Sequence, residues 1–216
     1  ADTVTREIYG YEALVRWFHP VRGAVPPTVF IPVAEKIGLI NALGEWVLKT
    51  ACAEAASWAT PLKVSVNVSP IQLMNTSLTD TIIEVLHQTG LDPRRLDLEI
   101  TESDVFNENT RSLEILSQLR ELGIQISIDD FGTGYSSLSR LSYFPFDKIK
   151  IDRSFVINIP EQKDDLDIVR LIISMGKSLH MRIVAEGVET EEQLASLQAL
   201  GCDLVQGYLI GKPSPL

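Results

Sequence analysis

Two neighbouring carboxylates, Asp129 and Asp130, are the residues of this chain whose types and spacing point most directly to chemistry. Adjacent carboxylates repel each other unless cations lie between them, and one of the two could bridge two metal ions. The segment that follows, Phe131 to Ser137, contains two glycines and small hydroxyl residues. Such a loop directly after a strand suits close approach of backbone N–H groups to an anion. The pair and its loop therefore suggest metal-assisted chemistry on an anionic substrate.

Further polar residues lie at the ends of short β-branched runs. In chain order they are Glu12 and Arg16, Asn67, Glu99 and Glu102, Asp129 and Asp130, Lys150 and Asp152, Glu186 and Glu189, and Gln206. Any single one of them is more often a solvated loop residue than a functional one. Because every run carries such a residue near its end, we expect these side chains to lie together at one rim of the fold. Oxygen ligands without accompanying His or Cys favour Mg²⁺ or Mn²⁺ over zinc.

Alternation along the runs gives these residues a common direction. Asp97 and Glu99 share one face of their run, as do Lys148, Lys150 and Asp152 of another. A period of two predicts that these polar groups face the interior of a barrel while the aliphatic residues face helices. A buried lysine and buried carboxylates are costly unless they are paired with each other or bind metal.

The elements that must position these residues alternate between strands and helices. The predicted strands are Ile8–Trp17, Lys63–Val68, Arg95–Thr101, Gln125–Asp129, Lys148–Asp152, Arg182–Ala185 and Leu204–Leu209. Leucines spaced by three predict helices that end at Gly123 and at Gly201. Thr190 and Gln193 fit a capping box, and Thr79 or Asp80 is expected to begin the helix that ends near Gly90.

Strand–helix alternation with short loops predicts parallel strands and right-handed crossovers. We favour a (β/α)8 barrel, because in that fold functional residues collect at the carboxyl ends of the strands; a doubly wound open sheet is the alternative. A closed barrel needs eight strands and the sequence offers seven, so the eighth is expected to precede Ala1.

Composition excludes several classes of function. With a net charge of −10, the surface repels nucleic-acid polymers and anionic membranes. Bound metal ions could still reverse the local field for a small anionic ligand. No signal peptide and no apolar stretch near ~18 residues is visible. The two distant cysteines, Cys52 and Cys202, suit a reduced cytoplasmic setting. Asp130-Phe131-Gly132 resembles a kinase element, but the other kinase motifs are missing.

Taken together, the motifs resemble the EAL domain, the bacterial cyclic di-GMP phosphodiesterase family. The matching segments are Tyr11–Trp17, Val66–Ser69, Leu98–Glu102, Asp129–Ser137, Lys150–Asp152, Val184–Glu189, Gln206–Tyr208 and Lys212–Pro213. They follow in order from Tyr9 to the C-terminus, and as a set they are highly specific. One conservative departure is Val15, where Leu is common in the family.

The resemblance implies a TIM-like barrel with one antiparallel strand, and a single EAL-type domain over residues 1–216. It also implies that the family's first strand and preceding helix are absent from this chain, which would be N-terminally truncated. The activity implied is divalent-metal-dependent hydrolysis of cyclic di-GMP to linear pGpG, in bacterial second-messenger signalling. The implied cofactors are two Mg²⁺ or Mn²⁺ ions, with Ca²⁺ inhibitory.

The resemblance also assigns roles to individual residues. Metal ligands would be Glu12, Asn67, Glu99, Asp129 and Asp130, with Asp129 bridging the two ions. Lys150 would orient or deprotonate the attacking water, Glu186 would belong to the metal-and-water shell, and Glu102 would anchor the loop after Asp130. Arg16 would grip a substrate phosphate, Gln206 would hold a water or substrate oxygen, and Asp152 would support the substrate site.

Family members are often dimers and are often fused to sensor or cyclase domains. A homodimer and such fusions are therefore expected of the whole protein. The domain itself is expected to be cytoplasmic and to make no membrane contact, although other domains could anchor the full-length protein.

Two other functions remain open from the residues. A silent receptor could bind cyclic di-GMP without cleaving it, but this chain keeps the first glutamate and the aspartate pair that such receptors often lose. An enolate-forming barrel enzyme also uses strand-end carboxylates and a lysine. The aspartate pair and the glycine-hydroxyl loop argue against it.

Overall fold

The computed structural model describes residues 1–102, 110–133, 141, 144 and 146–215. These residues form two units, which we describe separately. Unit 1 comprises Ala1–Gly10, Glu99–Asn109 and Gln125–Leu216, and unit 2 comprises Tyr11–Leu98 and Thr110–Ile124. A search of the described residues finds no helix with the length and apolar character needed to cross a membrane.

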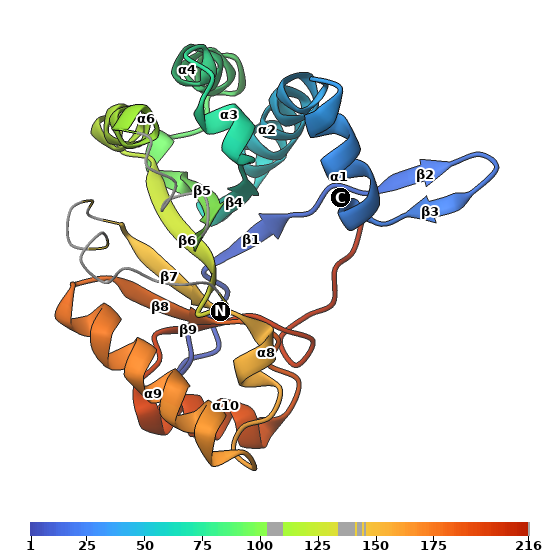
Figure 1. The fold of residues 1–216 in the computed structure, drawn as a ribbon. Helices are drawn as coiled ribbons and strands as arrows, with labels where there is room; N and C mark the ends of the chain where they lie inside the picture. Colours follow the sequence, from blue (N-terminus) through green and yellow to red (C-terminus); the bar gives the residue numbers. More distant parts are fainter. Residues whose placement is uncertain (103–109, 134–140, 142–143, 145, 216) are drawn as a thin grey trace. The chain divides into compact units, whose positions relative to one another are not determined.

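Strands and helices alternate along the chain, as predicted for the α/β class (Figure 1). Seven strands form one sheet in the order β1-β4-β5-β6-β7-β8-β9, and β2 and β3 form a separate two-stranded sheet. Two strands of the large sheet have residues in both units: β1 (Gly10–Ala13) and β5 (Leu96–Thr101).

Parallel strands form the centre of unit 1. They are β6 (Gln125–Phe131), β7 (Lys148–Ile151), β8 (Arg182–Ala185) and β9 (Leu204–Val205). A register shift lies between Ile128 and Phe131 of β6. Among the described residues, this unit contains the helices α8 (Arg153–Val156), α9 (Lys163–Ser178) and α10 (Glu191–Leu200).

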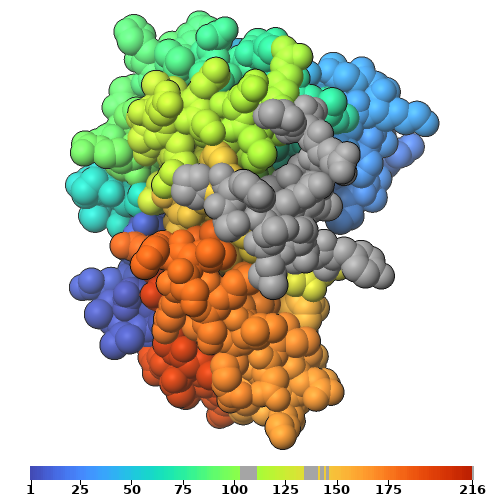
Figure 2. Space-filling model, turned by 60° about the vertical axis from the view of Figure 1, so that its left-hand side comes forward, coloured from blue at the N-terminus to red at the C-terminus, as the bar shows by residue number. Residues whose placement is uncertain are grey.

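Helix α9 packs on β7 and β8 because the residues of its inner face are apolar and include one glycine. Gly176 is buried there, and a Cβ atom at this position would lie 2.1 Å from Cδ1 of Ile183. Residues of α9 lie at the surface in Figure 2, where they are coloured orange. The side chain of Leu171, in the same helix, is exposed. Close packing of one face fixes the helix against β7, which carries Lys150, and against β8, which Glu186 directly follows.

Two aspartates fix neighbouring strands of unit 1 at the ends where the strands begin. Asp147, which precedes β7, accepts a hydrogen bond from the Ile126 N–H of β6 at 3.0 Å. Asp203, which precedes β9, accepts one from the Ile183 N–H of β8 at 2.8 Å. These two hydrogen bonds help to fix the register between neighbouring strands, and therefore the relative positions of the residues at their carboxyl ends.

Helices α2 (Ile40–Ser57) and α4 (Leu78–Thr89) pack against each other in unit 2, and α2 also packs on β4 (Lys63–Asn67). The remaining elements of this unit are β2 (Trp17–His19), β3 (Gly23–Val25), α1 (Pro27–Lys36), α3 (Pro70–Leu73), η1 (Pro93–Arg95) and α6 (Thr110–Glu121). Arg95 Nη2 donates to the Ala55 carbonyl at 2.6 Å, which satisfies a carbonyl near the end of α2.

Most sequence-based boundaries are confirmed to within a few residues. Gly90 and Gly201 end their helices with positive φ angles of 70° and 74°, and the Thr190–Gln193 capping box is present. Two boundaries are wrong, because Trp17 lies in β2 and not in the first strand, and the last strand is only Leu204–Val205. Helix α4 begins at Leu78, one residue before the predicted Thr79.

Residues Ala1 to Glu7 turn back on themselves. The Asp2 N–H donates to the Glu7 carbonyl at 2.9 Å, and Asp2 bridges Leu204 of β9 in the antiparallel sense. The N-terminal residues therefore pair with the last strand of unit 1.

Candidate functional site

Lys150 lies at the centre of a buried ionic cluster in unit 1. Its Nζ atom is 2.7 Å from Glu99 Oε2, 3.1 Å from Asp129 Oδ1 and 2.6 Å from Glu186 Oε1. These three carboxylates come from β5, from β6 and from the residue after β8. The ammonium group is thus matched by more than one negative charge, as a buried lysine requires. Alternation along the strands correctly predicted that Glu99 and Lys150 are buried.

Asp130 extends the cluster, and its backbone is held in an uncommon conformation. Its φ angle is +53°, in the left-handed region that Asp tolerates better than most residues. The Thr133 hydroxyl donates to the Asp130 carbonyl at 2.8 Å and stabilises this turn. Although the side chain is partly accessible, loss of hydration raises the pKa of Asp130 to about 6, helped by the nearby charges of Asp129 and Asp152.

Asp129, Asp130 and Glu186 fit a hard divalent cation. Each offers one carboxylate oxygen, and the three oxygens all lie within 4.8 Å of one another. Carboxylates are the ligands that Mg²⁺ and Mn²⁺ favour. Burial is the main cause of the raised pKa of Asp130, and the negative charges of Asp129 and Asp152 add to it, because neighbouring carboxylates without a cation destabilise one another's charge. The donor set therefore suits the metals that the sequence predicts.

Glu102 contacts the loop that follows Asp130. Its Oε2 atom accepts a hydrogen bond from the Gly132 N–H at 2.9 Å, and the Glu102 side chain is buried. The family resemblance assigns Glu102 the role of anchoring this loop, and the contact at Gly132 supports that prediction. The later loop residues, from Gly134 to Ser137, lie outside the described residues.

Asp152 and Gln206 lie beside the cluster, but in roles that the sequence did not specify. Asp152 caps α8 by accepting a hydrogen bond from the Ser154 N–H at 3.0 Å, and it also faces Asp130. The Gln206 N–H donates to the Ala185 carbonyl at 2.9 Å, and the Val188 N–H donates to the Gln206 carbonyl at 3.0 Å. The Gln206 backbone thus flanks the segment that carries Glu186.

Glu12 and Asn67 pair with each other in unit 2. Asn67 Nδ2 donates to Glu12 Oε1 at 2.7 Å, which joins the end of β4 to β1. The Asn67 side chain uses its amide nitrogen in this bond, and its amide oxygen is the atom that would bind a metal ion. Arg16 is exposed, and its Nη1 atom donates to the Val15 carbonyl at 3.1 Å.

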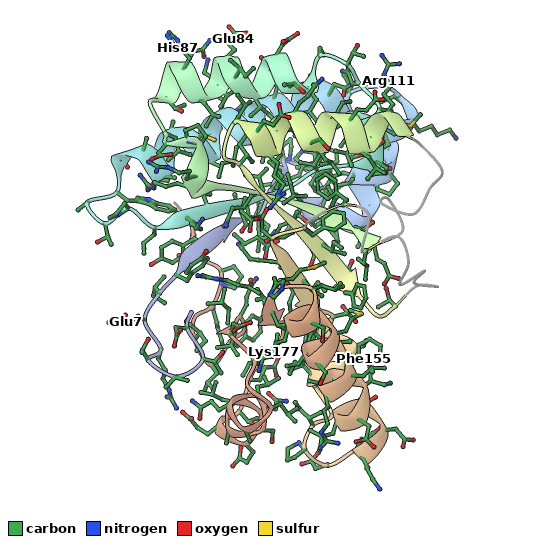
Figure 3. All side chains as sticks on the ribbon, turned by 90° about the vertical axis from the view of Figure 1, so that its left-hand side faces the viewer. Glu7, Glu84, His87, Arg111, Phe155 and Lys177 are labelled. Carbon is green, nitrogen blue, oxygen red and sulfur yellow. The ribbon has the colours of Figure 1, made fainter. Side chains whose placement is uncertain are left out.

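Two residues of α8 were missed by sequence reasoning. Phe155, which is labelled in Figure 3, lies against Gly132. The Arg153 side chain lies against Gly187 and pairs with Glu189 at 2.8 Å. A lone aromatic and a lone arginine after a strand give no recognisable signal. The nearest clue was a glycine shortly after each acidic segment, at 132 and 187, which suggests close approach by another group.

Comparison with known proteins places this geometry in a family. The sequence model of the family described as "EAL domain" matches residues 1–213. An uncharacterized signaling protein of Caulobacter vibrioides is 57% identical over 97% of this chain and 26% of its own length. The cyclic di-GMP phosphodiesterase NbdA of Pseudomonas aeruginosa is 45% identical over 97% of this chain and 27% of its own length.

A solved structure described as the PaMucR phosphodiesterase in complex with c-di-GMP is also similar. It has a TM-score of 0.92 and 45% identity, over 97% of this chain and 86% of that chain. Such domains are TIM-like barrels, which confirms the predicted barrel and not the alternative of a doubly wound open sheet. This chain spans about a quarter of the length of the curated relatives described above.

Proposed function

The chain belongs to the EAL domain family, and we propose that it hydrolyses one phosphodiester of cyclic di-GMP to linear pGpG in bacterial second-messenger signalling. The observation that carries the proposal is the cluster of Lys150 with Glu99, Asp129 and Glu186, with Asp130 beside it. In this cluster, carboxylates that could bind a cation lie next to a lysine that could orient or deprotonate a water molecule. Relatives named as phosphodiesterases of this substrate support the choice of reaction.

Two Mg²⁺ or Mn²⁺ ions would be held by Glu12, Asn67, Glu99, Asp129 and Asp130, with Asp129 shared, and Ca²⁺ would inhibit. When bound, such ions make water more acidic and offset the charge on phosphoryl oxygens. Glu186 would complete the shell of metal and water. Glu102 would keep the Gly132 peptide, and with it Asp130, in place.

Lys150 would orient the attacking water or accept its proton. Its three carboxylate partners keep the ammonium group directed into the cluster. Arg16 would bind a substrate phosphate, because a guanidinium can donate two parallel hydrogen bonds to phosphate oxygens. Gln206 would hold a water or substrate oxygen, and Asp152 would support the substrate site through Asp130.

Incubation of the protein with cyclic di-GMP and either Mg²⁺ or Mn²⁺ tests this proposal directly. We expect linear pGpG, detected by anion-exchange chromatography and mass spectrometry, and no product with EDTA or with Ca²⁺. Absence of pGpG with both Mg²⁺ and Mn²⁺ would overturn the enzymatic function. Tight binding of cyclic di-GMP in Ca²⁺ without turnover in Mg²⁺ would instead identify a receptor.

We infer further domains in the whole protein, because the relatives are much longer than this chain. Sensor or cyclase modules, a homodimer and a cytoplasmic location are part of the same proposal. Light scattering on the purified chain, with and without Mg²⁺ and cyclic di-GMP, measures the oligomeric state.

A further inference from the structure

The four-residue helix α8 contacts both segments that carry candidate metal ligands in unit 1. It directly follows Asp152 at the end of β7, so it starts between β6 and β8 in the strand order. Gly132 is the second residue after Asp130, and Gly187 follows Glu186 directly. Both glycines have positive φ angles, of 101° and 70°.

On one side, the Phe155 ring lies against the backbone of Gly132. A Cβ atom at Gly132 would lie 2.8 Å from Cε2 of Phe155, so the ring occupies the space that a side chain would need. The same peptide donates its N–H to Glu102 at 2.9 Å. Gly132 is therefore held by a carboxylate and by an aromatic ring, two residues after Asp130.

On the other side, the methylene groups of Arg153 lie against Gly187. A Cβ atom at Gly187 would lie 2.2 Å from Cγ of Arg153. The guanidinium continues to Glu189, at 2.8 Å, but both side chains of this ion pair are exposed. Exposed ion pairs contribute little to stability. We therefore attribute the positioning of Gly187 to the methylene packing and not to the charge.

These contacts give α8 a single mechanical role. We propose that α8 is a spacer that sets the separation of Asp130 from Glu186, with Phe155 and Arg153 as positioning residues for the cation that these carboxylates bind. Carboxylate oxygens of Asp129, Asp130 and Glu186 lie within 4.8 Å of one another, and a change in either flanking segment would alter that spacing. The role rests on the proposed function only for the identity of the cation as Mg²⁺ or Mn²⁺.

Mn²⁺ binding measured by electron paramagnetic resonance, without cyclic di-GMP, tests the role of Phe155. In Phe155→Ala the Gly132 peptide loses its nearest apolar neighbour. We expect the Mn²⁺ site of Asp129, Asp130 and Glu186 to lose about 10-fold in affinity, as for other groups behind metal ligands. Phe155→Leu should recover most of this affinity because it refills the space. Circular dichroism checks that each variant is folded.

Ile157→Ala is the matched control. Ile157 also carries an apolar side chain close to α8, but 42% of it is exposed. This variant should bind Mn²⁺ as the wild type does. Equal affinity in Phe155→Ala and the wild type would overturn the role of Phe155, as would an equal loss in Phe155→Ala and Ile157→Ala.

Arg153 is tested by two substitutions that separate packing from charge. Arg153→Met keeps the methylene groups over Gly187, and Arg153→Ala removes them. We expect Arg153→Met to bind Mn²⁺ within about twofold of the wild type and Arg153→Ala to lose about 10-fold. If both lose affinity equally, the ion pair with Glu189 acts instead, and if neither does, the spacer role of Arg153 is wrong.

The same measurements separate this proposal from the phosphodiesterase proposal. Mn²⁺ affinity is read without substrate, so the spacer role can hold in a protein that cleaves nothing. If the wild type produces pGpG while every α8 variant keeps wild-type Mn²⁺ affinity, the enzymatic function stands and the spacer role falls.

Discussion

The ammonium nitrogen of Lys150 lies 2.7 Å from Oε2 of Glu99, and each side chain is only 3% exposed. Two charges removed from water at this depth are stable only because further partners are present, here Asp129 and Glu186. Lys150 therefore contributes one positive charge to a cluster in which the carboxylates outnumber it. A metal ion would share these carboxylates with the lysine, so metal binding and the position of the ammonium group are linked.

Lys150→Met should lower both stability and activity. Without the ammonium group the buried carboxylates lose their shared partner, and breaking a buried ion pair typically costs about 3–5 kcal/mol. Thermal unfolding in EDTA should show this loss, and Mg²⁺ should recover more stability in the variant than in the wild type. Loss of a proton-transfer group should lower kcat for cyclic di-GMP by about 10²–10⁴.

Lys148→Met is the control for that experiment. Lys148 is buried on the same face of β7, where its ammonium group lies 5.3 Å from the centre of the Tyr9 ring. The substitution should destabilise the protein without lowering kcat at a temperature where it remains folded. A kcat loss of similar size in both variants would assign the effect of Lys150→Met to stability alone.

Glu102→Gln and Glu102→Ala should differ, because only an oxygen acceptor is required at Gly132. The glutamine carbonyl can still accept the Gly132 N–H, whereas alanine leaves this donor without its carboxylate partner, at a cost of about 1–3 kcal/mol. We expect the half-saturating Mn²⁺ concentration for pGpG formation to rise severalfold in Glu102→Ala and less in Glu102→Gln. Equal effects would show that the charge of Glu102 matters more than its hydrogen bond.

Much of the local structure could be predicted because it depends on residues close in sequence. The Thr190–Gln193 capping box and the glycine that ends α10 are local contacts, and the alternation in β7 correctly oriented Lys150. The packing of Phe155 on Gly132 could not be predicted, since it joins residues brought together only by the fold. The hairpin of β2 and β3 was missed because its strands, of three residues each, are too short to show a period.

The residues of the candidate site were likewise predicted only where the pattern along the strands was informative. Strand ends gave the positions of Glu99, Asp129 and Lys150, which the structure brings together. The capping of α8 by Asp152 needed the position of Ser154 in space, which no pattern of residue types supplies. Patterns thus predicted that Glu99, Asp129 and Lys150 gather, but not how the neighbouring helices support them.

Asn67→Asp tests the role of the Glu12–Asn67 pair. Asn67 Nδ2 donates to Glu12 at 2.7 Å, and an aspartate would replace this donor by a like charge. We expect a lower Tm than the wild type in EDTA and a larger rise in Tm on adding Mg²⁺, because a cation would offset the new repulsion. Asn67→Ala should instead reduce the rise in Tm caused by Mg²⁺. No change in the Mg²⁺ response of either variant would remove Asn67 from the metal site.

Asp130→Asn should stabilise the metal-free protein at neutral pH but not in acid. Burial and the charges of Asp129 and Asp152 raise the pKa of Asp130 from 3.8 to about 6. Between these values the folded state binds more protons than the unfolded state, so the Asp130 contribution to stability falls as pH rises, and the penalty is complete above about pH 6. The variant removes this titration.

Thermal unfolding in EDTA from pH 5 to pH 8 measures that prediction. The Tm advantage of Asp130→Asn should be largest at pH 8 and should shrink toward pH 5, whereas Mg²⁺ should favour the wild type because the ionised carboxylate is the ligand. Asp92→Asn is the control, since hydrogen bonds from Arg94 lower the pKa of Asp92 to about 2. Asp92 is then ionised throughout this range, in both the folded and unfolded states above about pH 5, so its effect should not vary with pH. An Asp130→Asn advantage that is equally flat would show that the carboxylates around Asp130 do not destabilise its charge.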